Sequence, residues 1–193
     1  MGITLLKTLK EVRACTLCKD DLELGPRPVL QIHKEARVLI SGQAPGIKVH
    51  LSGVPFDDAS GERLRSWMGI ERDVFYDATK IAILPMGFCY PGKGTSGDLP
   101  PLKRCAATWR EKLLAQLPNI KLNLVIGLYA QQWHFLRPDL NLTDTVKRWH
   151  EFGDEVLPLP HPSPRNNIWL KKNAWFETDV MPELKNRVSQ ALR

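Results

Sequence analysis

The stretch Ala36–Ser41 (ARVLIS), followed directly by Gly42–Gly46 (GQAPG), decides the fold class of this 193-residue chain. A short apolar run containing β-branched residues predicts a strand buried on both faces, and such strands are typical of parallel sheets. The glycines and the proline that follow end the strand. The same pattern recurs further along the chain.

Three further runs are predicted to be strands, and they are Lys80–Pro85, Leu122–Gly127 and Val156–Pro160. Helices are predicted at Met1–Arg13, Ser60–Gly69, Cys105–Leu117, Tyr129–Leu136, Thr143–His150 and Trp175–Leu192. Ser60 is the expected N-cap of its helix. Strands that alternate with helices predict an α/β fold with a parallel sheet covered on both faces. Because no linker or repeat is visible, residues 1–193 are expected to form one domain.

The charge and the apolar patterning restrict the function classes. The net charge is +6 with a pI near 9.2, which favours phosphate-bearing partners without being specific for them. No run of eighteen apolar residues occurs, so no membrane span is expected. The N-terminal segment is typical of an amphipathic helix and not of a secretory signal, which predicts a cytosolic protein.

The cysteines predict a metal or cluster site. Cys15 and Cys18 form a C-x2-C pair, and Cys89 and Cys105 follow with fifteen residues between them. Thiolates brought together in this way bind iron–sulfur clusters or zinc, and structural disulfides are rare in the cytosol. The spacing favours a cluster and leaves zinc or free thiols as alternatives.

Three unusual segments each follow a predicted strand. They are Gly42–Gly46, the segment 85–88 (PMGF) and the segment 161–167 (HPSPRNN). Because ligands of open parallel sheets bind at the carboxyl ends of the strands, these segments are expected to share a site.

Several residues in or near these segments could carry chemistry. His161 could donate a hydrogen bond to an oxyanion, or be a buried core histidine. Asp57 and Asp58 could support a developing sugar cation, or simply favour a helix N-terminus. Phe56 could stack on a base, or pack in the core.

Together these pieces resemble the uracil-DNA glycosylase superfamily. Gly42–Gly46 resembles its first motif, His161-Pro162-Ser163-Pro164 resembles its second, and Phe56 stands where the family has a base-stacking Phe. The four cysteines resemble those of the iron–sulfur family-four members, which carry a 4Fe-4S cluster. The resemblance runs from about Val12 to Arg165.

The resemblance implies a three-layer α/β/α sandwich with a four-stranded parallel sheet, and a monomer that excises a damaged or deaminated base from DNA. It implies catalytic roles for His161, Asp58 and Gln43. It implies base contacts from Ala44, Gly46, Phe56 and Met86. It implies DNA contacts from Ser163, Arg165, Lys171 and Lys172, with Arg165 at the position of the wedge residue.

The chain also departs from the family pattern. Ala44 stands where the best-known branch has a water-activating Asp, and Gln43 stands where family-four members have Glu. Asp58 belongs to a run, Asp-Ala-Ser-Gly, that another branch carries one residue further from its Phe. No Asn follows the second predicted strand, where relatives read the uracil edge. Two alternatives to a glycosylase are therefore a non-catalytic nucleic-acid binder on this fold and a nucleoside or nucleotide hydrolase.

Overall fold

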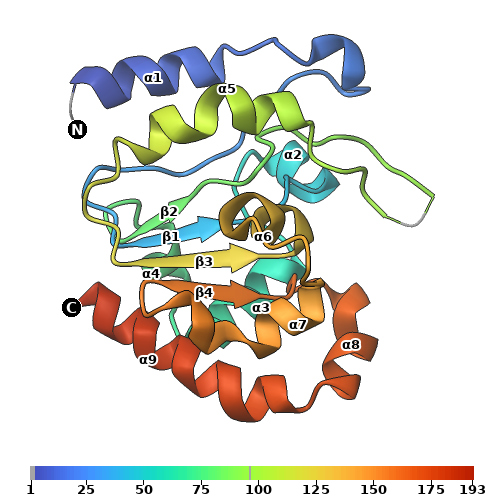
Figure 1. Ribbon diagram of the computed structural model, residues 1–193. Coiled ribbons are helices and arrows are strands. Elements are labelled where there is room, and N and C mark those ends of the chain that lie inside the picture. Colours follow the sequence, from blue (N-terminus) through green and yellow to red (C-terminus); the bar gives the residue numbers. More distant parts are fainter. Residues whose placement is uncertain (1–2, 96) are drawn as a thin grey trace.

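The structure is a computed structural model that describes residues 3–95 and 97–193. Its centre is a four-stranded sheet in the order β2-β1-β3-β4, in which every neighbouring pair is parallel (Figure 1). The strands are β1 (Val38–Ser41), β2 (Ile81–Ile83), β3 (Leu122–Ile126) and β4 (Val156–Leu159). All four predicted strands are confirmed, with slightly shorter bounds.

Nine α-helices are present in the described part of the chain. They are α1 (Ile3–Arg13), α2 (Ile47–Ser52), α3 (Ala59–Met68), α4 (Arg72–Tyr76), α5 (Lys103–Leu114), α6 (Leu128–Phe135), α7 (Leu142–Lys147), α8 (Asn167–Lys172) and α9 (Met181–Leu192). The six predicted helices are found with shifted ends, and the predicted start at Met1 lies outside the described residues. The helices α2, α4 and α8 were not predicted, because they have at most six residues and show no helical period.

Two of the predicted helices differ in kind from the expectation. The segment predicted at Thr143–His150 divides into α7 and a 3-10 turn at Trp149–Phe152. The C-terminal helix begins as a π-helical segment, Phe176–Val180, before α9. None of the helices in the described residues is long and apolar enough to cross a membrane.

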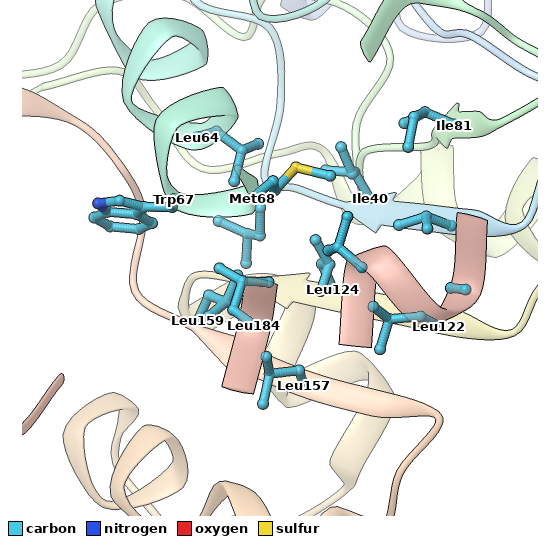
Figure 2. Packing of buried hydrophobic residues seen from close by; sticks show 14 of the residues in the cluster. Ile40, Leu64, Trp67, Met68, Ile81, Leu122, Leu124, Leu157, Leu159 and Leu184 are labelled. Atoms are coloured by element: carbon cyan, nitrogen blue, oxygen red, sulfur yellow. The ribbon is translucent and has the colours of Figure 1, made fainter. Parts of the chain in front are cut away.

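Helices cover both faces of the sheet. Successive strand residues point to opposite faces, so neighbouring side chains pack against different helices. Val38 and Ile40 pack in the larger core cluster with α3, α4 and α9, whereas Leu39 packs with α1 and α5. Figure 2 shows Leu64, Met68 and Leu184 gathered around Ile40 and Leu124 in the larger cluster. The molecule is therefore the expected three-layer α/β/α sandwich (Figure 1).

The start of α3 corrects one prediction. Ser60 lies inside the helix, and the N-cap is Asp58, whose Oδ1 accepts a hydrogen bond from the Gly61 N–H at 2.9 Å. An extended backbone at Asp58 lets its short carboxylate reach this exposed donor. Gly69 ends the helix in a left-handed conformation, as predicted.

Candidate active site

A cleft with a volume of about 480 Å³ lies at the carboxyl ends of the strands. The segments after β1 and β4, Pro85 after β2 and the start of α3 all contribute to its lining. Gln43, Phe56, Asp58 and His161 line it together, along with Ala44 and Gly46. This volume lies in the range of small-molecule sites, so a single flipped nucleotide could enter.

His161 is held as a neutral hydrogen-bond donor. The backbone N–H of Ser163 donates to His161 Nδ1 at 3.2 Å, so Nδ1 is the acceptor nitrogen of the ring. Burial lowers the pKa of His161, and the nearby Asp58 and Asp98 oppose this shift. A neutral imidazole with Nδ1 unprotonated carries its proton on Nε2. His161 can therefore donate a hydrogen bond from Nε2 to an oxygen in the cleft while its ring is neutral.

Phe56 forms one wall of the cleft in a strained backbone conformation. Its φ is +55°, which is uncommon for a bulky residue. Gly61 allows this conformation, because a Cβ at Gly61 would lie 1.8 Å from the Phe56 carbonyl oxygen. The Phe56 ring is half-buried and meets Phe75 edge-on at 6.2 Å between centroids. Backbone strain of this kind persists only where the surrounding structure maintains it, and it is common at active and ligand-binding sites.

The two neighbouring aspartates have different surroundings. Asp57 pairs with Arg72 at 3.0 Å and does not line the cleft. Asp58 lines the cleft while its Oδ1 is fixed by Gly61. Of the two, Asp58 is therefore the carboxylate positioned for chemistry in the cleft.

Backbone hydrogen bonds join the loops that follow β1 and β2. Met86 N–H donates to the Gly42 carbonyl at 2.9 Å, and Gly87 N–H donates to the Gln43 carbonyl at 3.0 Å. The Met86 side chain is only 5% exposed and packs with Ala106 and Val125 in a core cluster. Met86 is not among the residues that line the cleft, whereas Pro85 of the same loop is, and the base contact from Met86 stays a prediction.

Arg165 and Ser163 also line the cleft, and Lys171 and Lys172 are exposed at the end of α8. The Arg165 guanidinium lies against Gly97 in the facing loop, where a Cβ would be 2.5 Å from Nη1. Arg63 of α3 steadies the segment after β4 by donating to the Ser163 carbonyl at 3.1 Å. Arg165 is thus an exposed lining residue whose guanidinium lies next to Gly97.

Arg110 of α5 is a fully buried cation directly behind the cleft. Its Nη1 donates to the Leu84 carbonyl at 2.6 Å, and its Nη2 donates to Ser41 Oγ at 2.6 Å and contacts His134 Nε2 at 2.8 Å. No carboxylate pairs with it among the described residues. Burial lowers the pKa of Arg110 to about 10, which still leaves it charged at neutral pH.

The partners of Arg110 complete a buried polar network. Ser41 Oγ donates to Asn123 Oδ1 at 2.8 Å, and Asn123 Nδ2 lies 3.4 Å from His134 Nδ1. Burial and the Arg110 charge lower the pKa of His134 to about 3, so its ring is neutral. The network ties α5 to the ends of β1 and β2, from which the cleft loops begin. Sequence reasoning missed it, although the spacing Ala106, Arg110, Leu113 already placed Arg110 on the buried face of α5.

A second, smaller pocket is lined by all four cysteines together with apolar residues that include Leu17 and Trp109. The indole N–H of Trp109 donates to Cys15 Sγ at 3.4 Å, and the Phe88 N–H donates to Cys105 Sγ at 3.4 Å. Such N–H bonds to sulfur also stabilise cluster thiolates. The N-terminal segment, the loop after β2 and the start of α5 therefore meet at one thiol-rich point.

A single ion and a cluster make different demands on the four thiols. In the described chain, no group of three or more His, Cys, Asp or Glu side chains is arranged to hold one metal ion. A single zinc needs its four ligands drawn closely around it, whereas in a cubane cluster each thiolate binds a different iron atom. Burial raises the pKa of Cys89 to about 11 and that of Cys105 to about 12, so any metal must displace these protons.

Comparison with known families agrees with this geometry. The family model described as the uracil DNA glycosylase superfamily matches residues 31–185, most of the chain. The match includes both cleft motifs, whereas Cys15 and Cys18 lie before it. The chain belongs to the uracil-DNA glycosylase superfamily, whose members act on DNA, and this membership implies a DNA glycosylase activity.

Proposed function

We propose that the protein hydrolyses the N-glycosidic bond of a deaminated base in DNA, uracil or a related base, in base-excision repair. The observation that carries this proposal is the fixed tautomer of His161. Its Nδ1 accepts from Ser163, which leaves the Nε2 proton for an oxygen in the cleft. A donor aimed at developing negative charge is a principal source of catalysis in such reactions.

In the proposed reaction, the target nucleotide leaves the stack and its base enters the cleft. Phe56 stacks on the base, and Gln43 and the backbone of its loop bind the base edge. As the C1′–N bond breaks, negative charge builds on the base, and His161 donates a hydrogen bond to its carbonyl oxygen. Asp58, fixed by Gly61, supplies negative charge beside the sugar cation.

The base itself is tested with a panel of oligonucleotides that carry uracil, hypoxanthine, xanthine or a mismatch at one position. We expect alkali-labile abasic sites to form in at least one damaged oligonucleotide and not in the matched undamaged one. The panel is needed because Pro85 and the buried Met86 occupy the loop where an Asn would read uracil.

A second candidate function is a non-catalytic binder of damaged DNA. It is favoured by the absence of an acidic side chain at Ala44 and of an amide after β2. Selective binding of one damaged oligonucleotide without abasic sites would support this candidate against the first.

We further propose that Cys15, Cys18, Cys89 and Cys105 hold a 4Fe-4S cluster. When bound, the cluster would cross-link the N-terminal segment, the loop after β2 and α5. That link would hold both ends of the loop between β2 and α5, which reaches the cleft at Asp98.

Replacing Cys89 by alanine should abolish the cluster, because one of four iron ligands is lost. We expect anaerobically purified protein to be brown, with iron and acid-labile sulfide in equal amounts, and the Cys89→Ala variant to be colourless. Thr16→Ala, inside the first cysteine pair, is the matched control and should remain brown. Stoichiometric zinc in the anaerobic protein would contradict the proposal.

DNA affinity should fall steeply with salt, because binding a basic surface releases counterions from the phosphates. Lys48 is exposed and lines the cleft, so Lys48→Gln should reduce the slope of log K against log salt by about 1. Lys121, at the amino end of β3, is the control, and Lys121→Gln should leave the slope unchanged. A salt-independent affinity of the unaltered protein would contradict binding through phosphates.

A further inference from the structure

A carboxylate that belongs to no sequence motif reaches the cleft from the loop between β2 and α5. This loop forms a hairpin in which Lys93 and Asp98 pair as an antiparallel bridge. The Leu99 N–H donates to the Gly92 carbonyl at 2.9 Å and closes the hairpin. The loop extends on the side of the sheet where the strands end (Figure 1). Asp98 is thereby held at the cleft, which it lines.

Asp98 lies beside the loop Gly42–Gly46, which contains no acidic residue. A Cβ at Gly46 would be only 3.4 Å from Asp98 Oδ2, so the absence of a side chain at Gly46 leaves room for this carboxylate. Gly46 is two residues beyond Ala44 in the same loop. Asp98 is also close enough to His161 to oppose the lowering of its pKa, as Asp58 does. The cleft therefore has two carboxylates, Asp58 and Asp98, close enough to His161 to influence its pKa.

The two carboxylates are bonded differently. Asp58 Oδ1 accepts the Gly61 N–H, which fixes its position and suits it to the role of a stationary negative charge. Asp98 accepts no side-chain hydrogen bond and forms no ion pair with any residue that the structure describes. Both of its oxygens are thus available to a water molecule.

We propose that Asp98 is the general base that accepts a proton from the attacking water; this inference rests on the proposed function. The C1′–N bond breaks and its electron pair stays on the base. The water oxygen forms the new bond to C1′, and one water proton passes to the Asp98 carboxylate. That proton reaches the released base through solvent, which restores the carboxylate and balances the reaction.

The test is the single-turnover rate of base release from the oligonucleotide that the panel identifies. Asp98→Ala should slow release by about 10²-fold or more, the usual contribution of a general base, with DNA affinity unchanged. Formate should restore part of the rate to Asp98→Ala, because it supplies a carboxylate to the vacated space. Formate should not accelerate the unaltered protein. Asp73→Asn in α4, an exposed aspartate outside the cleft, is the matched control and should keep the full rate.

Each contrary outcome has a separate meaning. A rate of Asp98→Asn within about threefold of the unaltered protein would overturn the assignment alone, since a general base contributes far more. A slow Asp98→Ala variant that formate does not rescue would also overturn it, because Asp98 would then only shape the loop. No base release by the unaltered protein from any oligonucleotide would overturn the proposed function and this assignment with it.

Discussion

Replacing His161 by alanine should slow base release about 10²–10³-fold, the usual cost of removing one donor to a developing oxyanion. The Nε2–H bond to the base carbonyl strengthens as negative charge builds, so its loss raises the barrier far more than it weakens binding. DNA affinity should therefore change little. Single-turnover rates and titrations with labelled oligonucleotide measure the two quantities separately.

His150 provides the matched control for this experiment. It is exposed in the 3-10 turn at Trp149–Phe152 and does not line the cleft, so His150→Ala should keep the full rate. If His161→Ala released base at a rate within about threefold of that of the unaltered protein, His161 would not be the donor to the developing oxyanion.

Replacing Arg110 by alanine should lower the free energy of unfolding by about 3–5 kcal/mol, because a buried acceptor that loses its donor costs about 1–3 kcal/mol. The substitution would strand the Leu84 carbonyl and His134 Nε2 and would leave a cavity in their place. This is a large share of the 5–15 kcal/mol that is typical of a domain. Urea unfolding at constant pH measures the change.

Two further variants isolate the cause of the loss. Arg137→Ala removes an exposed arginine paired with Asp139 and should leave the free energy of unfolding nearly unchanged. The double variant Arg110→Met/His134→Leu replaces the charged and neutral partners by apolar side chains, while Ser41 still bonds Asn123. It should be more stable than Arg110→Ala, because fewer buried polar groups lack partners. A loss below about 1 kcal/mol for Arg110→Ala would contradict the structural role of the network.

The sheet was predictable because its signals are local. Each strand is a short apolar run that ends in glycine or proline, and a run such as Ala36–Ser41 needs no distant partner to be recognised. Short helices such as α2 and α8 escaped prediction, since tertiary packing stabilises them and not their own periodicity. The N-cap was misplaced for a related reason. Both Asp58 and Ser60 can cap a helix, and the extended backbone at Asp58 is what brings its carboxylate to the Gly61 N–H.

The site was predictable where a motif follows a strand. His161 and Gln43 reach one cleft because parallel strands bring their carboxyl ends together. Met86 follows β2 but packs in a core cluster, because a residue's position after a strand does not tell whether its side chain turns into the cleft or into the core. Asp98 and Arg110 depend on contacts between distant segments, with Gly46 in one case and with Ser41 and His134 in the other. No local pattern encodes such contacts.

The central claim is that this cleft releases a base from DNA, and the most direct measurement is the identity of what leaves the DNA. Each damaged oligonucleotide is incubated with the unaltered protein or with His161→Ala, and the small molecules are separated and analysed by mass spectrometry. We predict one intact free base, in an amount equal to the abasic sites formed, and strongly reduced release by His161→Ala. DNA that is bound by the unaltered protein but releases no base from any oligonucleotide would contradict the claim.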